Sequence, residues 1–326
     1  MSEQSMTRVR LRHAGGPEAL TVETGPVPVP GAGQVLLRTE AAGVAFNDVT
    51  TRQGLNPGRL PHVLGFDAVG RVLATGPDVT GFTAGQRVGA LVGTGGYATH
   101  VLAPATQTAP LPEDADAATL DALMLNYLTA YQMFHHIARP RPGSTVLVLG
   151  AAGGVGSALT QIALSAGVTV YGTSSPPRRA RVEALGATWA ADAASVPMPV
   201  AATFDPVGGP SLALSRRATA RDGVVVSYGF SFASGTGRTR TRALGGMVAA
   251  IARAMLTPGP RLVLHTVEGA VSRNPARFRT DIDALVGLLA GGAITPEVTT
   301  LPLAQAAEAH RLLESRQVTG KIVLLP

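Results

Sequence analysis

Three glycines at a three-residue spacing, Gly150, Gly153 and Gly156, are the residues of this chain whose chemistry is easiest to recognise. Glycine admits a positive φ in a tight turn and lets a ligand approach the bare backbone amides. When a helix starts at such a turn, its first amides and its dipole can bind the phosphates of a nucleotide. The spacing predicts a pyrophosphate-binding turn, provided that a strand precedes it and a helix follows.

Both flanking elements are expected. The run from Thr145 to Leu149 is β-branched and aliphatic, which is typical of a buried strand. After the glycines, Leu159, Ile162 and Ala163 recur at helical spacing. The alternative is an ordinary glycine-rich turn in a chain that has 39 glycines. The order of strand, glycines and helix favours the dinucleotide interpretation.

The residues after the next expected strand discriminate between the two nicotinamide dinucleotides. NAD-binding units carry an acidic residue about twenty positions past the glycines, which hydrogen-bonds the ribose 2′-hydroxyl. This chain has Gly-Thr-Ser-Ser at 172–175, followed by Arg178 and Arg179. Hydroxyls and guanidiniums bind a 2′-phosphate, whereas a carboxylate would repel it. The pattern favours NADPH over NADH; the alternative, a solvated helix face, explains Arg181 better than Arg179.

The composition excludes several classes of function. The chain has 326 residues, 45% hydrophobic and 15% charged, which is typical of a globular protein long enough for two domains. It has no cysteine, so disulfides, thiolate metal sites and cysteine nucleophiles are excluded. The net charge of +6 comes from scattered arginines, since Lys321 is the only lysine. With 4% aromatic residues, the chain lacks the aromatic interleaving of a nucleic-acid groove.

No segment of the sequence predicts secretion or a membrane span. Residues 1–6 are polar and lack the apolar core of a signal peptide. The apolar run from Met247 to Leu256 is interrupted by Arg253 and is shorter than a bilayer requires. We therefore expect a cytoplasmic protein that acts on a small molecule and has no nucleic-acid or membrane partner.

Residues 7–104 are expected to form a β-rich domain. Short strands separated by glycine and proline turns are predicted at 9–12, 20–23, 34–38, 68–73, 87–92 and 97–102. Because no helical crossover lies between most of these strands, they should form an antiparallel sheet that is barrel-like or partly open.

From residue 117 onward, strands and helices alternate. Further helices are expected over 116–124, 127–136, 177–185, 211–218 and 276–289, and further strands over 169–172, 202–205, 223–228, 261–267 and 320–325. This alternation predicts an α/β fold with a parallel, doubly wound sheet, and the last strand should return to the N-terminal sheet. The segment 231–262 has two interpretations, a cover over the active cleft or a surface excursion at a dimer contact.

Several motifs together resemble the zinc-independent medium-chain dehydrogenase/reductases. They are the glycine turn, Gly-Val-Ala-Phe-Asn-Asp at 43–48 with Arg52 and Gly54, Leu-Gly-Phe-Asp-Ala-Val-Gly at 64–70, Leu-Asn-Tyr-Leu-Thr-Ala-Tyr at 125–131, Phe-Asp-Pro-Val-Gly-Gly at 204–209, and Gly320-Lys321. The most similar branches are the NADPH quinone oxidoreductases and the vesicle-amine-transport-protein group. The resemblance implies a GroES-like catalytic domain, residues 1–124 and 268–326, and an inserted Rossmann domain for NADPH, residues 125–267, usually in a homodimer.

The resemblance also bears on metal binding. Zinc-dependent relatives have a cysteine where this chain has Ala45 and a histidine where it has Phe66. Neither side chain can bind a metal, and Asp67 alone is insufficient. We therefore expect no metal site.

The proton donor is less evident than the hydride donor. Some relatives have a tyrosine at the position of Thr50, whose own hydroxyl is a poor general acid. Asn47, through bound solvent, and Thr50 are the candidate catalytic residues, with Tyr127, Tyr131 and Tyr228 as alternatives. A site without a strong acid suits hydride transfer to an acceptor that delocalises negative charge, such as a quinone or an α,β-unsaturated carbonyl.

The resemblance also implies which residues bind the cofactor. They are Asn47 and Thr129 near the nicotinamide, Gly153, Gly154 and Val155 at the pyrophosphate, Ser174 and Arg179 at the 2′-phosphate, and in addition Val207, Tyr228, Gly229, Phe230 and Lys321. The leading hypothesis is an NADPH-dependent reductase of quinones or enones. The alternatives are a tailoring enoyl reductase or cyclase in a biosynthetic pathway, and a non-catalytic NADPH-binding protein.

Overall fold

The computed structural model describes residues 5–55, 60–229, 245, 249, 251–252 and 256–326, which fall into two compact units. Unit 1 comprises Met1–Leu128, Val271–Gly287 and Pro296–Pro326, and unit 2 comprises Thr129–Ala270 and Leu288–Thr295. The predicted domain boundaries after residues 124 and 267 lie near two of these divisions. The return of residues 288–295 to unit 2 is not predicted by the sequence pattern.

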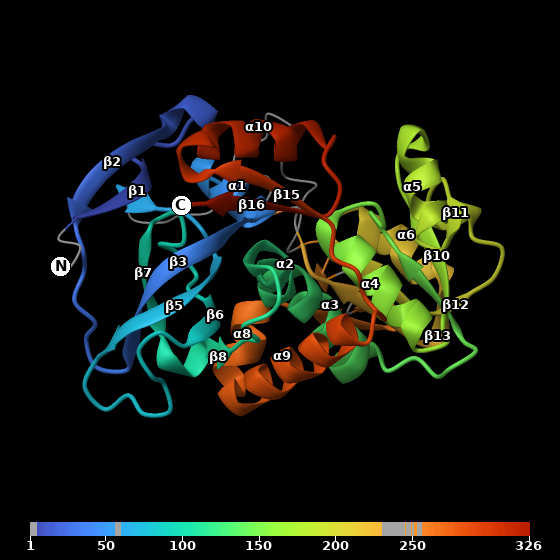
Figure 1. The fold of residues 1–326 in the computed structure, drawn as a ribbon. Coiled ribbons are helices and arrows are strands. Elements are labelled where there is room, and N and C mark those ends of the chain that lie inside the picture. Colours follow the sequence, from blue (N-terminus) through green and yellow to red (C-terminus); the bar gives the residue numbers. More distant parts are fainter. Residues whose placement is uncertain (1–4, 56–59, 230–244, 246–248, 250, 253–255) are drawn as a thin grey trace. The chain divides into compact units, whose positions relative to one another are not determined.

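Unit 1 contains two β-sheets (Figure 1). The smaller one has the order β2 (Leu20–Pro26), β1 (Ser5–Leu11) and β4 (His62–Val63). The larger one has the order β15 (Val298–Pro302), β16 (Lys321–Leu325), β3 (Gln34–Val44), β5 (Asp67–Thr75), β6 (Arg87–Leu91) and β8 (Thr108–Pro110), and β7 (His100–Pro104) also pairs with β3. Every pair is antiparallel except β15 with β16, so the predicted β-rich domain is confirmed.

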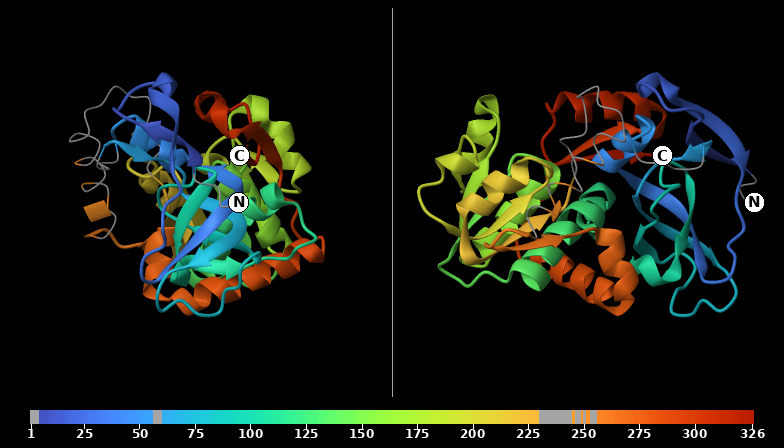
Figure 2. Two further views of the ribbon diagram at one scale, coloured as in Figure 1. Left: turned by 60° about the vertical axis from the view of Figure 1, so that its left-hand side comes forward. Right: turned by 180° about the vertical axis from the view of Figure 1, so that it is seen from behind.

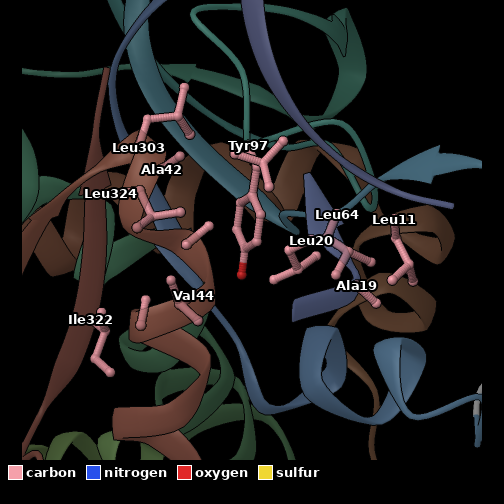
Figure 3. Packing of buried hydrophobic residues seen from close by; sticks show 13 residues of the cluster. Leu11, Ala19, Leu20, Ala42, Val44, Leu64, Tyr97, Leu303, Ile322 and Leu324 are labelled. Atoms are coloured by element: carbon pink, nitrogen blue, oxygen red, sulfur yellow. The ribbon is translucent and has the colours of Figure 1, made fainter. Parts of the chain in front are cut away.

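The last strand of the chain returns to the sheet of the N-terminal residues, as the sequence predicts. In the register of β16 and β3, Ile322 lies opposite Val44 and Leu324 opposite Ala42. Figure 2 shows the same ribbon from two further sides, with the red C-terminal end of the chain beside blue N-terminal segments. Their side chains join a buried aliphatic cluster that surrounds the ring of Tyr97 (Figure 3). Burying this apolar surface stabilises a unit whose residues are far apart in the sequence.

Helices and short turns complete unit 1. They are η1 (Pro17–Ala19), α1 (Phe46–Arg52), η2 (Ala105–Gln107), α2 (Ala117–Ala122), η8 (Leu303–Gln305) and α10 (Ala306–Ser315), while α8 (Val267–Arg273) and α9 (Pro275–Ala290) have residues in both units. Of these, α9 and the region of α2 are predicted from the sequence. The short α1 is not, because seven residues give too few turns for a recognisable apolar period.

Unit 2 contains a six-stranded parallel sheet. Its order is β11 (Thr188–Ala190), β10 (Thr169–Thr173), β9 (Thr145–Val148), β12 (Val200–Asp205), β13 (Thr219–Ser227) and β14 (Arg261–Leu264). The strands alternate in the chain with α4 (Gly154–Ser165), η5 (Pro176–Arg178), α5 (Arg179–Ala184), η6 (Ala193–Ser195) and α6 (Ser211–Ala218). This is the doubly wound order in which the direction of winding reverses at β9, so the predicted α/β fold class is confirmed.

Three expectations about elements are wrong. The two helices expected over 116–136 form one continuous stretch, α2, η3 (Leu123–Tyr127), α3 (Leu128–Tyr131) and η4 (Gln132–Ala138), in which η3 and η4 are π-helical. No glycine or proline interrupts residues 117–138, so nothing breaks the helix there. The strand expected over 97–102 begins only at His100, and the one expected over 261–267 ends at Leu264. Phe230 and most of segment 231–262 lie outside the described residues, so their predicted roles stay predictions.

Candidate active site

The glycine turn of unit 2 joins β9 to α4. Gly150 has a φ of 66°, and its carbonyl accepts a hydrogen bond of 2.9 Å from the amide of Gly153. A Cβ on Gly156 would lie 2.2 Å from that same carbonyl oxygen, so only glycine fits there. Strand, turn and helix therefore pack closely because two different positions lack a side chain.

The first turn of α4 carries the residues expected at the pyrophosphate. Gly153 precedes the helix, and Gly154 and Val155 are its first two residues. All three are partly exposed. The first amides of a helix have no hydrogen-bond acceptor within the helix, and the helix dipole puts a partial positive charge at the same end. This part of unit 2 therefore has the geometry that binds a phosphate anion.

Ser174 and Arg179 lie beyond the end of β10, at the position expected for the 2′-phosphate. Ser174 follows β10 directly and is partly buried, while Arg179 begins α5 and has a side chain that is 60% exposed. Trp189 touches both residues, and Glu183 forms an ion pair with Arg179. NAD-binding units have an acidic residue at the end of this strand, and this chain has none there.

A buried carboxylate shapes the turn after β12. One oxygen of Asp205 accepts the amides of Val207 and Gly208 at 2.7 and 2.9 Å, and the other accepts the hydroxyl of Ser215 at 2.7 Å. Asp205 thereby fixes the turn that carries Val207, one of the expected cofactor residues. The sequence reasoning missed this role, although a carboxylate two residues before a Val-Gly-Gly turn is a recognisable signal.

Tyr228 and Gly229 follow β13 beside that turn. The amide of Tyr228 donates to the Asp205 carbonyl at 3.0 Å, and a Cβ on Gly229 would lie 2.4 Å from the Pro206 carbonyl oxygen. Burial, with a smaller effect of the Asp205 charge, raises the pKa of Tyr228 above its ordinary value. This tyrosine is a poor proton donor. Thr129, the first residue of unit 2, is 7% exposed.

The two candidate catalytic residues lie on α1 of unit 1. Asn47 is exposed and Thr50 is partly buried. The Thr50 hydroxyl donates to the Asn47 carbonyl at 2.9 Å, one turn back along the helix. Its proton is thus already bonded to the backbone, and the oxygen is left as an acceptor.

Asp48, between these two residues, is a buried acceptor that the sequence analysis missed. Its carboxylate accepts the amide of Ala45 at 2.9 Å, the amide of Gly65 at 3.0 Å and the Tyr97 hydroxyl at 3.1 Å. Burial raises the pKa of Asp48 to about 6, although these hydrogen bonds oppose the rise. The side chain holds together the segment before α1 and the segment before β5.

A chain of hydrogen bonds continues from Asp48 through unit 1. The Tyr97 hydroxyl lies 3.1 Å from Nε2 of His310, and Arg52 donates from Nε to Nδ1 of His310 at 3.2 Å. Because arginine only donates, the neutral imidazole must carry its hydrogen on Nε2 and give it to Tyr97. Burial, and then the charge of Arg52, lower the pKa of His310 to about 3, so the ring is neutral. Arg52 also pairs with Glu314 at 2.7 Å.

Lys321 forms a second buried group in unit 1, with two carboxylates. Its Nζ lies 2.6 Å from Oδ2 of Asp67 and 3.9 Å from Oδ1 of Asp121, and all three residues are at most 2% exposed. A Cβ on Gly43 would lie within 2.5 Å of atoms of Lys321 and Asp121, so a glycine is required beside them. Burial raises the pKa of Asp121 well above its usual range, and the Asp67 charge raises it further.

This environment gives Lys321 a partner that the sequence analysis did not expect. The sequence reasoning places Lys321 at the cofactor, whereas in unit 1 its ammonium group is bonded to Asp67. Neither the pair nor the second carboxylate, Asp121, is evident from the sequence, since 254 residues separate Asp67 from Lys321. Contact of Lys321 with a cofactor stays a prediction.

The zinc-ligand positions of related dehydrogenases do not fit a metal in this chain. Ala45 and Phe66 offer no ligand atom, and Asp67 is bonded to Lys321. Among the residues that the structure describes, no three histidine, cysteine or acidic side chains are grouped as metal ligands.

Two family models match the chain. The alcohol dehydrogenase GroES-like domain matches residues 31–113, and the zinc-binding dehydrogenase matches residues 183–324. The chain is 32% identical to a quinone oxidoreductase of Pseudomonas aeruginosa over 98% of its own length and 99% of the relative's. The chain belongs to the medium-chain dehydrogenase/reductase superfamily. Within the superfamily it is similar to the quinone oxidoreductases and to the VAT-1 homologs.

Other members of this superfamily agree with that placement. A 2-haloacrylate reductase of Burkholderia is 33% identical, covering 97% of this chain and 98% of the relative, and a rat synaptic vesicle membrane protein VAT-1 homolog is 31% identical, covering 96% and 82%. The crystal structure of the Escherichia coli quinone oxidoreductase complexed with NADPH is similar at a TM-score of 0.85, with 26% identity, covering 98% of this chain and all of the other. The second family model has zinc in its description, whereas Ala45 and Phe66 of this chain offer no ligand atom. Over the described residues, no helix is both long and apolar enough to cross a bilayer.

Proposed function

We propose that this protein is an NADPH-dependent, zinc-independent oxidoreductase that transfers a hydride to a quinone or to an α,β-unsaturated carbonyl compound. Two residue types and one hydrogen bond in unit 1 carry the choice of acceptor. The positions that bind zinc in related enzymes hold Ala45 and Phe66, and the Thr50 hydroxyl is bonded to the Asn47 carbonyl. The chain thus offers neither a Lewis acid nor a strong general acid at these positions.

The acceptor must then stabilise negative charge by itself. A simple ketone or aldehyde would become a localised alkoxide, which needs a metal or a strong acid. A quinone or an enone spreads the charge over a conjugated system, and orientation with a single hydrogen bond is sufficient. The quinone oxidoreductase and the 2-haloacrylate reductase that resemble this chain are named for acceptors of this conjugated kind.

The residues of the chain have separate roles in this proposal. The first amides of α4, at Gly153, Gly154 and Val155, would bind the pyrophosphate, and Ser174 with Arg179 would bind the 2′-phosphate. Thr129, Val207, Tyr228, Gly229 and Asn47 would contact the remainder of the cofactor. When bound, NADPH supplies the hydride from C4 of its nicotinamide. Asn47 and the Thr50 oxygen would orient the quinone or enone and a water molecule that provides the proton.

Oxidation of NADPH, followed by its absorbance with a panel of quinones and activated enones, tests the proposal. We expect turnover with both classes, little with simple ketones, and full activity after treatment with a chelator. Tight NADPH binding without turnover of any acceptor would contradict the reductase and favour a non-catalytic NADPH-binding protein. Turnover of one conjugated biosynthetic intermediate alone would favour a tailoring reductase or cyclase.

Location and assembly are further parts of the proposal. The resemblance implies a homodimer, and the composition suggests a cytoplasmic protein. Size-exclusion chromatography with light scattering measures the first, and fractionation of cells that make the full chain measures the second. A monomer at working concentration would contradict the dimer without affecting the proposed reaction.

A further inference from the structure

Trp189 is the single tryptophan of the chain and lies on the edge strand of the sheet in unit 2. It belongs to β11, which pairs in parallel with β10 so that Trp189 lies opposite Gly172 and Ala190 opposite Thr173. The indole is partly buried. This register brings a large aromatic side chain next to Ser174, the first residue after β10.

The indole N–H determines how the Ser174 hydroxyl is used. Nε1 of Trp189 donates to Oγ of Ser174 at 3.1 Å, and that hydroxyl donates in turn to the Ser175 carbonyl at 3.1 Å. Tryptophan has a donor and no acceptor, so its bond occupies one lone pair of the Ser174 oxygen and leaves the single hydroxyl hydrogen for another partner. That hydrogen can turn from the exposed Ser175 carbonyl to a phosphate, which offers only acceptor oxygens near neutral pH, while the indole keeps the Ser174 oxygen in place.

The indole ring also contacts Arg179. The guanidinium carbon lies 5.1 Å from the ring centroid, within the range of a cation–π interaction, and Nε of Arg179 is 2.8 Å from Glu183. The Arg179 side chain is 60% exposed, and a long exposed side chain samples many rotamers. Two contacts reduce this freedom before any ligand binds, which lowers the entropy lost on binding.

We propose that Trp189 is a positioning residue that holds Ser174 and Arg179 ready for the 2′-phosphate of the adenosine and thereby sets the preference for NADPH over NADH. The inference rests on the proposed function, because it takes these two residues as the phosphate site. Trp189 acts through them and touches no reacting atom. A merely structural tryptophan would affect nucleotides with and without the 2′-phosphate equally.

A matched pair of nucleotides tests this role without turnover. Adenosine 2′,5′-bisphosphate and adenosine 5′-monophosphate differ only in the 2′-phosphate, and calorimetric titration gives the affinity of the full chain for each. The Trp189→Phe variant keeps an aromatic ring and loses the donor, and the Trp189→Leu variant loses both. For the bisphosphate we expect about threefold weaker binding with phenylalanine and about tenfold with leucine, as for one neutral hydrogen bond and one added cation–π contact. Binding of the monophosphate should be unchanged.

The wild-type protein provides a second readout, since all of its tryptophan fluorescence comes from this one indole. The bisphosphate should change the emission more than the monophosphate does. This measurement decides the question even if the leucine variant fails to fold. An equal response to both nucleotides, or variants that keep the wild-type preference for the bisphosphate, would overturn the role of Trp189.

The failure of this inference is distinguishable from that of the proposed function. If Ser174→Ala and Arg179→Ala lose the preference for the bisphosphate while both Trp189 variants keep it, the phosphate site stands and only the positioning role is wrong. If the wild-type protein binds both nucleotides equally, the phosphate site itself is wrong, and the role of Trp189 fails with it. If the preference holds but no acceptor oxidises NADPH, the reductase fails and the role of Trp189 stands.

Discussion

The two units use charged side chains in opposite ways. In unit 1, Asp67 and Lys321 form an ion pair whose side chains are at most 1% exposed. In unit 2, Arg179 and Glu183 form a pair at 2.8 Å whose side chains are 60% and 45% exposed. Desolvation makes the first pair costly to break, whereas solvent screens the second and makes it weak. The buried charges of unit 1 connect segments that are far apart in the sequence, whereas the exposed charges of unit 2 are available to a ligand.

The largest expected effect comes from removing the buried ammonium. The Lys321→Met variant leaves the Asp67 carboxylate in the interior without its counter-charge. We expect the free energy of unfolding to fall by about 3–5 kcal/mol, the usual effect of breaking a buried pair. Urea denaturation measures this change.

A double variant shows how much of that loss comes from the charge left unpaired. With Asp67→Leu added to Lys321→Met, both partners of the closest pair are gone, and much of the stability should return. A double variant that is as unstable as the sum of the two single variants would show that Lys321 and Asp67 act independently.

The next effect is a dependence of stability on pH. Burial raises the pKa of Asp48 to about 6, so the folded protein holds this proton more tightly than the unfolded chain does. The resulting stabilisation is fully present below the unfolded pKa of about 4 and is lost as pH rises through about 6. The free energy of unfolding should therefore increase by about 1.4 kcal/mol from pH 7 to pH 5 through this group, and the full effect of about 3 kcal/mol is reached only below pH 4.

The Asp48→Asn variant should show a smaller increase. Asp67 and Asp121 also have raised pKa values, so part of the increase should persist in the variant. Urea denaturation at several pH values measures the slope, with the exposed Glu183→Gln variant as control. If the unfolding free energy of Asp48→Asn depends on pH as steeply as that of the wild-type protein, the pH dependence comes from Asp67 and Asp121.

Removing the exposed arginine should affect binding and leave the fold intact. For Arg179→Ala we expect NADPH binding to weaken by about 1.5–3 kcal/mol, the scale of a hydrogen bond between charged groups. NADH binding and the melting temperature should stay nearly unchanged. Fluorescence titration with each cofactor measures the difference, and equal weakening of both would count against the 2′-phosphate site.

The smallest expected effect is that of the exposed carboxylate. Glu183→Gln breaks an ion pair between residues four apart on a short helix, and such pairs contribute about 0.3–0.5 kcal/mol. The change in unfolding free energy should lie in that range and vanish at high salt. A loss comparable to that of Lys321→Met would contradict the distinction between the two units.

The sequence by itself determined the parts of this protein that depend on neighbouring residues. The strand, glycine turn and helix at 145–165 follow from residue types, because a tight turn needs glycine and each element has its own apolar period. The alternation of elements then predicts the doubly wound sheet, and the residue types at Ala45 and Phe66 exclude two zinc ligands.

Only the tertiary structure decided which polar groups meet. Asp48 bonds to Tyr97 across 49 residues, Lys321 to Asp67 across 254, and Trp189 to Ser174 across the register of two strands. No local pattern encodes these pairs. They form because segments far apart in the sequence lie side by side in the fold, and because buried polar atoms need hydrogen-bond partners. For the same reason, the sequence pointed to Lys321 as a residue of note and gave no sign of its bond to Asp67.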